Sequence, residues 1–280
     1  MNNQILVIGG TGKTGRKVVT QLEKRGHQVR VGSRSATPAF DWEDPKTWSP
    51  ALEGMDKVYI TFQPDLAVPG ALDAIEGLTK KAAQAGVKKL VLLSGKGERE
   101  AELSEQVVMH SGLDYTIVRA SWFMQNFSES FFLDPILAGQ VALPKPEAKV
   151  PYVDTDDIAE VVVEALLDDT HNGKVYELTG PRLITFAEVM KEISLATGRH
   201  IAFTPISLEE YIGFLKQADV PSDYIWLIDY LFSNVLDAEG NNVVSPDVEK
   251  VLGRKPKDFT EYVLETQKTG VWNPKVKETV

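Results

Sequence analysis

The N-terminal segment carries three glycines at a regular spacing. Gly9, Gly12 and Gly15 follow the apolar run 5–8 and precede a stretch with helical periodicity. In this context the first glycine permits a tight turn, the second lets the backbone approach a pyrophosphate, and the third lets the helix pack closely. The amides and dipole of the helix then face the anion. The pattern predicts dinucleotide binding, and the expected cofactor-binding residues of the loop are Gly9, Thr11, Gly12, Lys13, Thr14 and Gly15.

The same loop contains Gly12-Lys13-Thr14, which also ends a Walker-type phosphate loop. That loop needs another glycine five residues before Gly12, where this sequence has Val7. A variant ATPase loop needs lysine in place of Ile8, and a magnesium-holding Asp is missing because the apolar run 91–93 leads into Ser94. Nucleoside triphosphate hydrolysis is therefore the weaker alternative.

Polar residues follow the second predicted strand. An acidic residue at this place binds both ribose hydroxyls of NAD. This sequence instead has Arg34 between Ser33 and Ser35, and a guanidinium makes charge-assisted hydrogen bonds to a 2′-phosphate. Ser33 and Arg34 are therefore expected to bind NADP (as NADPH), with NAD the less favoured cofactor. An ordinary solvated arginine at a strand end is the alternative interpretation.

Short β-branched runs alternate with helical periodicity over the first 120 residues, as in parallel strands joined by helical crossovers. Strands are expected at 5–8, 27–31, 57–62, 89–93 and 115–118, with a short one through Phe40. This pattern predicts an α/β fold with a Rossmann-type, doubly wound parallel sheet.

The second half of the chain changes character. The acidic run 154–157 predicts the start of a helix, and residues 175–178 return one strand to the sheet. Capping-box pairs predict helices beginning near 186 and 208, and Ser222 and Ser245 suggest two more. We expect residues 1–155 to form the NAD(P)-binding core, with its sheet completed by 156–180. Residues 181–280 are expected to form a smaller, mostly helical lobe on the substrate side.

Composition excludes several classes of function. The 40 acidic against 30 basic residues give a net charge of −10, which argues against nucleic acid and anionic membrane partners. The absence of cysteine excludes thiolate chemistry, and the 4 histidines are too scattered to suggest a metal site. No signal peptide pattern and no apolar stretch of about 20 residues occurs. A cytoplasmic protein is expected, and the sequence does not indicate its oligomeric state.

Several motifs together carry a family resemblance. They are the glycine segment 9–15, Arg34, Phe40-Asp41-Trp42, and the segments 111–119, 123–127, 153–159 and 176–180. With them the chain resembles, from about residue 4 to about 200, the NmrA-like family of atypical short-chain dehydrogenase/reductases. Within that family it is similar to either the festuclavine dehydrogenase branch or the NAD(P)H:quinone oxidoreductase branch.

The resemblance implies the location of the nicotinamide. Loops after the strands at 57–62 and 89–93 would flank it, which adds Thr61, Phe62 and Gln63 to the cofactor-binding residues. A lysine beside a nicotinamide can polarise a hydride acceptor, so Lys96 is the first catalytic candidate. Ser94 and Gln125 follow as residues that stabilise or orient the acceptor.

The usual proton donor of short-chain dehydrogenases is missing. They use Tyr-x-x-x-Lys to protonate a carbonyl oxygen, and none of the 8 tyrosines here has lysine four residues later. Reduction of an iminium ends neutral, and a quinone spreads its charge, so both need less acid catalysis than a ketone. We therefore expect an NAD(P)H-dependent oxidoreductase that reduces an activated conjugated acceptor, such as a quinone or an imine. The alternative is a non-catalytic NADP-binding redox sensor with a regulatory role.

Aromatic residues are abundant in two stretches of the chain. They are Trp122, Phe123, Phe127, Phe131, Phe132, Trp226, Tyr230 and Phe232. Core packing is the expected role for most of them. Their number also allows a pocket for a flat substrate, so the expected partner is a small apolar or aromatic molecule.

Overall fold

A computed structural model describes residues 3–274 of the chain. By their contacts the residues form two compact units. Within the described residues, unit 1 comprises 3–121, 155–178 and 245–255, and unit 2 comprises 122–154, 179–244 and 256–274. Each unit is made of three separate segments of the chain. The sequence analysis predicted a core of residues 1–155 whose sheet is completed by 156–180, and a second lobe of residues 181–280.

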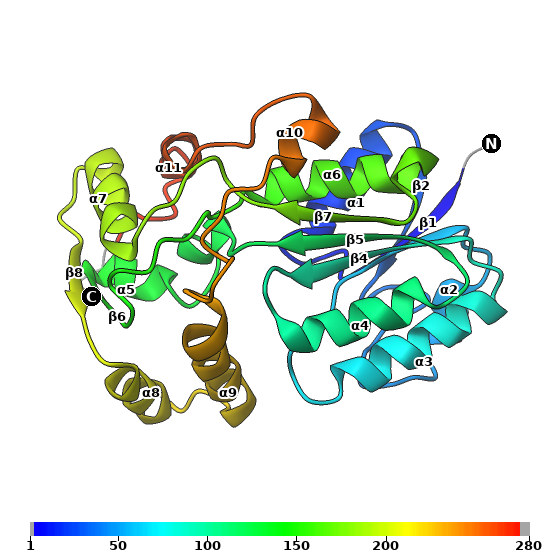
Figure 1. The fold of residues 1–280 in the computed structure, drawn as a ribbon, viewed down its shortest axis with the longest axis horizontal. Coiled ribbons are helices and arrows are strands. Elements are labelled where there is room, and N and C mark those ends of the chain that lie inside the picture. The colour runs from blue at the N-terminus through cyan, green and yellow to red at the C-terminus, as the bar shows by residue number, and fades with distance from the viewer. Residues whose placement is uncertain (1–2, 275–280) are drawn as a thin grey trace, which may run out of the picture. The chain divides into compact units, whose positions relative to one another are not determined.

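Unit 1 is built on a parallel sheet of six strands in the order β2-β1-β3-β4-β5-β7 (Figure 1). The strands are β1 (Gln4–Ile8), β2 (Gln28–Gly32), β3 (Lys57–Ile60), β4 (Lys89–Gly95), β5 (Asp114–Ala120) and β7 (Lys174–Leu178). The order reverses at β1, which has β2 on one side and β3 on the other. This topology confirms the predicted Rossmann-type sheet, including the strand that returns late in the sequence. Ligands of such sheets bind at the carboxyl ends of the strands near the reversal.

Helices cover both faces of this sheet (Figure 1). One face carries α2 (Trp48–Leu52), α3 (Ala71–Gln84) and α4 (Arg99–Met109), and the other carries α1 (Gly15–Lys24) and α6 (Thr155–Leu167). The short η2 (Asp169–His171) follows α6, and α10 (Asp247–Leu252) packs on α6 and β7. Because both faces are buried at the centre of the sheet, the inner strands β1, β3 and β4 are nearly continuous apolar runs.

Two lysines fix the amino edge of the sheet to the end of α6. Lys57 Nζ donates to the carbonyl oxygen of Leu166 at 2.6 Å, and Lys89 Nζ donates to that of Asp168 at 3.1 Å. These carbonyls lie at the C-terminal end of the helix, where cations are favoured by the helix dipole. Both lysines are buried, and burial lowers the pKa of Lys89.

The predicted strand through Phe40 is wrong. Phe40 is buried in an irregular segment, with its ring centroid 5.0 Å from that of Trp42 and 6.3 Å from that of Trp48. Trp48 Nε1 donates to the Asp41 carbonyl oxygen at 2.6 Å. Side-chain packing therefore holds this segment in place without a ladder of backbone hydrogen bonds.

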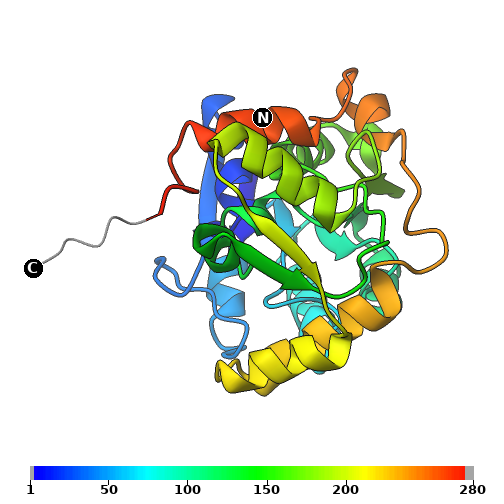
Figure 2. The same cartoon turned by 90° about the vertical axis from the view of Figure 1, so that its left-hand side faces the viewer.

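Unit 2 combines a two-stranded parallel sheet with helices. The strands are β6 (Gln140–Leu143) and β8 (Ala202–Pro205). The helices are η1 (Met124–Phe127), α5 (Leu133–Ala138), α7 (Phe186–Thr197), α8 (Leu208–Gln217), α9 (Ser222–Tyr230), η3 (Leu231–Val235) and α11 (Phe259–Gln267). Figure 2 shows α7 and α11 side by side. The capping boxes of Thr185 with Glu188 and of Ser207 with Glu210 are confirmed.

An aromatic core holds unit 2 together. Its largest members are Phe127, Phe132, Tyr152, Phe186, Phe232, Phe259 and Trp272. The predicted core role is confirmed for Phe127, Phe132 and Phe232, and the partly buried Trp122 packs against the same core, whereas Phe131 and Trp226 are exposed. Among residues 3–274, no helix is long and apolar enough to cross a membrane.

Candidate cofactor and catalytic site

The glycine loop joins the carboxyl end of β1 to the start of α1. Gly9 adopts a φ of +69°, which favours glycine, and its amide donates to the Gly32 carbonyl oxygen at 2.9 Å. The Gly10 amide donates to the same oxygen at 3.4 Å, and the Gly12 amide donates to the Gly9 carbonyl oxygen at 2.8 Å. The loop is therefore fixed to the end of β2.

The other two glycines have different surroundings. A Cβ atom on Gly15 would lie 2.1 Å from the Gly9 carbonyl oxygen, so this position admits only glycine while the loop keeps its shape. A Cβ atom on Gly12 would meet nothing nearer than the same oxygen at 3.2 Å, and no other atom within 4 Å. The backbone at Gly12 thus has an open side, as the approach of a pyrophosphate requires.

The start of α1 is suited to an anion. The first turn of the helix contains no acidic residue, and no side chain caps it. Within the described chain, no backbone carbonyl accepts a hydrogen bond from the Thr11 or Thr14 amide. These features fit the phosphates of a dinucleotide.

Side chains of the loop differ in their availability. Thr11 is exposed and Lys13 is half-buried. The Thr14 hydroxyl is buried and accepts a hydrogen bond from the Tyr59 hydroxyl at 3.0 Å. Burial raises the pKa of Tyr59, so this donor keeps its proton. Thr14 Oγ1 accepts this bond and therefore keeps its own proton, so both the hydroxyl and the amide of Thr14 can donate to a phosphate.

Ser33 and Arg34 directly follow β2 beside the glycine loop. Ser33 Oγ lies 3.3 Å from Ser35 Oγ, within hydrogen-bond distance. Arg34 is exposed, and no hydrogen bond or ion pair connects its guanidinium with another residue of the described chain. The structure thus leaves this cation available at the strand end where the sequence predicts the adenosine ribose.

The loop after β3 is tied to the end of β1. Thr61 Oγ1 donates to the Ile8 carbonyl oxygen at 3.1 Å, and Trp42 Nε1 donates to the Thr61 carbonyl oxygen at 3.1 Å. The Phe62 ring lies 4.8 Å from that of Trp42, and Gln63 is exposed. The structure therefore brings Thr61, Phe62 and Gln63 to the same edge of the sheet as the glycine loop.

Ser94 and Lys96 lie at the end of β4 within a network of charges. Ser94 Oγ donates to Glu105 Oε1 at 2.6 Å, and Glu105 is fully buried. Arg119 of β5 binds the same carboxylate through Nε and Nη2, with a shortest distance of 2.6 Å. Lys96 Nζ lies 3.5 Å from Glu177 Oε2. The pairing of Lys96 with Glu177 is a connection that the sequence analysis missed, because the two residues are far apart in the chain.

The third catalytic candidate belongs to the other unit. Gln125 lies in η1 and is buried, and its Nε2 donates to Asp154 Oδ1 at 3.2 Å. The Gln125 side-chain amide is thus hydrogen-bonded within unit 2. Ser94 and Lys96, in contrast, both lie at the end of β4 in unit 1. Among the described residues, no group of three or more His, Asp or Glu side chains could hold a metal ion.

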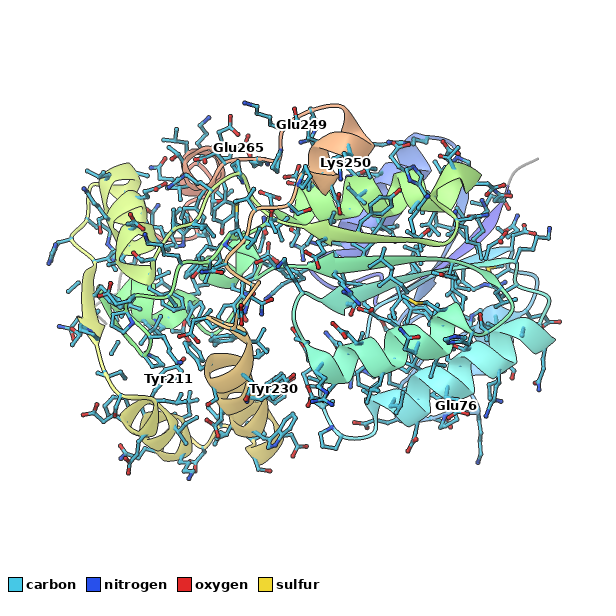
Figure 3. The ribbon with its side chains drawn as sticks, in the orientation of Figure 1. Glu76, Tyr211, Tyr230, Glu249, Lys250 and Glu265 are labelled. Atoms are coloured by element: carbon cyan, nitrogen blue, oxygen red, sulfur yellow. The ribbon has the colours of Figure 1, made fainter. Side chains whose placement is uncertain are left out.

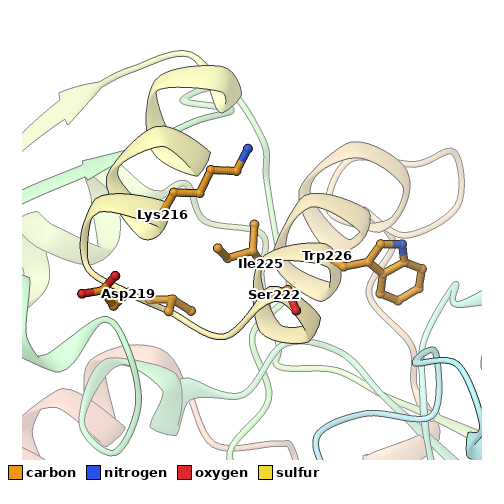
Figure 4. A pocket seen from close by; sticks show the side chains of 6 residues that line it. Lys216, Asp219, Ser222, Ile225 and Trp226 are labelled. Atoms are coloured by element: carbon orange, nitrogen blue, oxygen red, sulfur yellow. The ribbon is translucent and has the colours of Figure 1, made fainter.

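A surface depression of about 490 Å³ lies between α8 and α9 in unit 2 (Figure 4). Lys216, Asp219, Val220, Ser222, Ile225 and Trp226 line it. It contains none of the predicted cofactor-binding or catalytic residues. The depression is therefore not the candidate site.

The parallel sheet, the reversal at β1 and the open glycine loop define a dinucleotide-binding protein of the Rossmann class. The NAD(P)H-binding family matches residues 9–169, and the chain belongs to this family. The predicted membership of the atypical short-chain dehydrogenase/reductases is confirmed.

Three relatives align with nearly the whole chain. Prestalk A differentiation protein A of Dictyostelium discoideum is 32% identical, covering 94% of this chain and 92% of its own. The NAD(P)H azoreductase of Xenophilus azovorans is 30% identical, with coverage of 92% and 96%. The agroclavine dehydrogenase of Claviceps fusiformis is 29% identical, with coverage of 96% and 98%.

A solved structure supports the fold. The NADPH-dependent quinone oxidoreductase of Escherichia coli, in complex with NADPH, superposes with a TM-score of 0.78. It is 22% identical to this chain, and the superposition covers 93% of this chain and 99% of the other. This structure supports the fold alone, and the dehydrogenase and azoreductase relatives show that this chain is an NAD(P)H-dependent oxidoreductase.

Proposed function

We propose that the protein uses NADPH to reduce an activated, conjugated acceptor such as a quinone, an imine or an azo compound. The observation that carries the proposal is the glycine loop, whose backbone is open at Gly12 and lies beside the unpaired guanidinium of Arg34. A reduced nicotinamide bound there supplies hydride at the carboxyl edge of the sheet. The names of the azoreductase and of the quinone oxidoreductase favour acceptors of this class.

Lys96 has the chemistry to assist the transfer. Hydride addition to a quinone or an azo bond builds negative charge on oxygen or nitrogen, and a preorganised ammonium stabilises that charge. The Lys96 side chain is buried, and Glu177 holds its ammonium at the end of β4. Gln125 remains a weaker proposal for orienting the acceptor, because its amide already binds Asp154.

The absence of Tyr-x-x-x-Lys limits the acceptors. Reduction of a simple ketone produces an alkoxide, which requires a strong proton donor, whereas an activated acceptor spreads or neutralises the charge. The proposed function is therefore reduction of acceptors that are already electron-poor.

Measurement of NADPH consumption tests this function. We expect steady oxidation of NADPH with at least one member of a set of quinones, iminium compounds and azo dyes, and little with simple aliphatic ketones. Binding of NADPH without consumption in the presence of every acceptor would identify a sensor instead of a reductase.

Lys96→Ala is expected to lower kcat about tenfold, which corresponds to about 1.4 kcal/mol, while the Kd for NADPH changes less than about twofold. The reason is that the ammonium acts on the charge that develops in the acceptor. Steady-state kinetics and cofactor titration provide the two measurements.

Lys88→Ala is the matched control, because Lys88 precedes β4 at the opposite edge of the sheet and its side chain is exposed. Equal losses in both variants, or a loss of NADPH affinity that accounts for the whole effect, would remove Lys96 from the mechanism.

A further inference from the structure

Two carboxyl groups from different loops meet at the carboxyl edge of the sheet in unit 1. Asp65 lies in the loop after β3, and Glu98 immediately precedes α4. Glu98 is 7% exposed and Asp65 is half-buried. The two groups lie close enough for each to shift the pKa of the other. Since two neighbouring carboxylates repel each other, the pair is stabilised when one member holds a proton.

The surroundings place the proton on Glu98. Burial raises the pKa of Asp65 too, but its Oδ1 accepts a hydrogen bond from the Ala67 amide at 2.8 Å, which opposes that rise. Glu98 Oε2 is buried and accepts no hydrogen bond from an N–H or O–H group of the described residues. Burial raises the pKa of Glu98 well above its usual value, and the negative charges of Asp65, Glu100 and Glu105 act in the same direction.

The backbone of β4 makes room for this acid. A Cβ atom on Gly95 would lie 2.0 Å from Glu98 Oε1 and 2.1 Å from Glu98 Cδ. The carboxyl group therefore rests directly against Gly95, the last residue of the strand and the neighbour of Lys96. This is the edge at which ligands of the Rossmann class bind.

We propose that the Asp65–Glu98 pair is the proton donor for the acceptor, in place of the missing Tyr-x-x-x-Lys. This role rests on the proposed reduction. The acceptor gains hydride, and with it two electrons, from the reduced nicotinamide. The O–H bond of Glu98 then breaks, and an O–H or N–H bond forms on the reduced acceptor. The half-buried Asp65 takes a proton from water and returns it to Glu98.

Glu98→Gln tests the donor role, because glutamine keeps the shape and can donate an N–H to Asp65 but has no proton to release. We expect kcat with a quinone or an azo dye at neutral pH to fall by about 10²-fold, the lower end of the usual contribution of a general acid. The Kd for NADPH should not change. Glu76→Gln is the control, since Glu76 is exposed on α3 (Figure 3) and should retain the wild-type kcat.

The pH dependence of kcat is a second test, because it would not change if Glu98 had only a structural role. Because the pKa of Glu98 is raised, its acid form is present at low and neutral pH and is lost as the pH rises through that pKa. Wild-type kcat should fall over this range, whereas the residual kcat of Glu98→Gln should not follow the same transition.

Carboxyl ¹³C NMR of the cofactor-free protein tests the pair without turnover. A protonated carboxyl signal at neutral pH is expected in the wild type and in Glu76→Gln, and it should be absent from Glu98→Gln. A fully ionised pair at neutral pH, or a folded Glu98→Gln enzyme with wild-type kcat and pH profile, would overturn the proposal while the reductase function stands. A wild-type protein that reduces no acceptor would instead refute the proposed function, and the donor role with it.

Discussion

Gly12→Val is expected to abolish dinucleotide binding while the protein remains folded. The open side of the backbone at Gly12 is where the pyrophosphate has to approach, and an isopropyl group there would occupy that space. Loss of two charge-assisted hydrogen bonds, at about 1.5–3 kcal/mol each, corresponds to a loss of affinity of at least about 10²-fold. Calorimetric titration with NADPH measures the effect.

The structure offers a matched comparison within the same loop. Gly12→Val should keep a cooperative thermal transition, because only the Gly9 carbonyl oxygen comes within 4 Å of its new Cβ atom. Gly15→Ala should lower Tm, because its Cβ atom overlaps that same oxygen. Wild-type affinity in a folded Gly12→Val protein would show that the cofactor binds elsewhere.

Arg34→Ala is expected to remove most of a preference for NADPH over NADH. A charge-assisted hydrogen bond to the 2′-phosphate contributes about 1.5–3 kcal/mol, so the affinity for NADPH should fall by roughly 10–100-fold. NADH has no 2′-phosphate, and its affinity should hardly change. Parallel titrations with the two cofactors measure the difference.

Lys24→Ala controls for the change in net charge, because Lys24 is exposed in the last turn of α1, away from the glycine loop. It should leave both affinities near their wild-type values. An equal fall for NADH and NADPH in Arg34→Ala would make Arg34 a structural residue and would leave the choice of cofactor to other groups.

The sequence was sufficient to predict features that depend on nearby residues. The glycine spacing places a turn between a strand and a helix, and the pairs Thr185 with Glu188 and Ser207 with Glu210 cap helices three residues apart. The same pattern in Asp258 and Glu261 forms a third capping box, which the sequence analysis did not use although the signal was present.

Features that depend on distant contacts were not predictable in the same way. The segment around Phe40 has aromatic residues typical of a strand, but ring packing holds it in an irregular shape. Asp65 and Glu98 each resemble a charged residue of an exposed loop. Their shared proton follows from burial and from the absence of a side chain at Gly95, neither of which is visible in a local pattern.

The buried lysines Lys57 and Lys89 have a consequence for how this protein can change. They fasten α6 at the amino edge of the sheet, whereas the glycine loop and the carboxyl pair lie at the carboxyl edge. The length of the strands therefore separates the two lysines that stabilise the fold from the residues that are proposed to bind the ligand. Substitutions at the carboxyl edge can therefore change acceptor preference without disturbing the contacts of Lys57 and Lys89, which continue to stabilise the fold. Such a separation makes the scaffold evolvable.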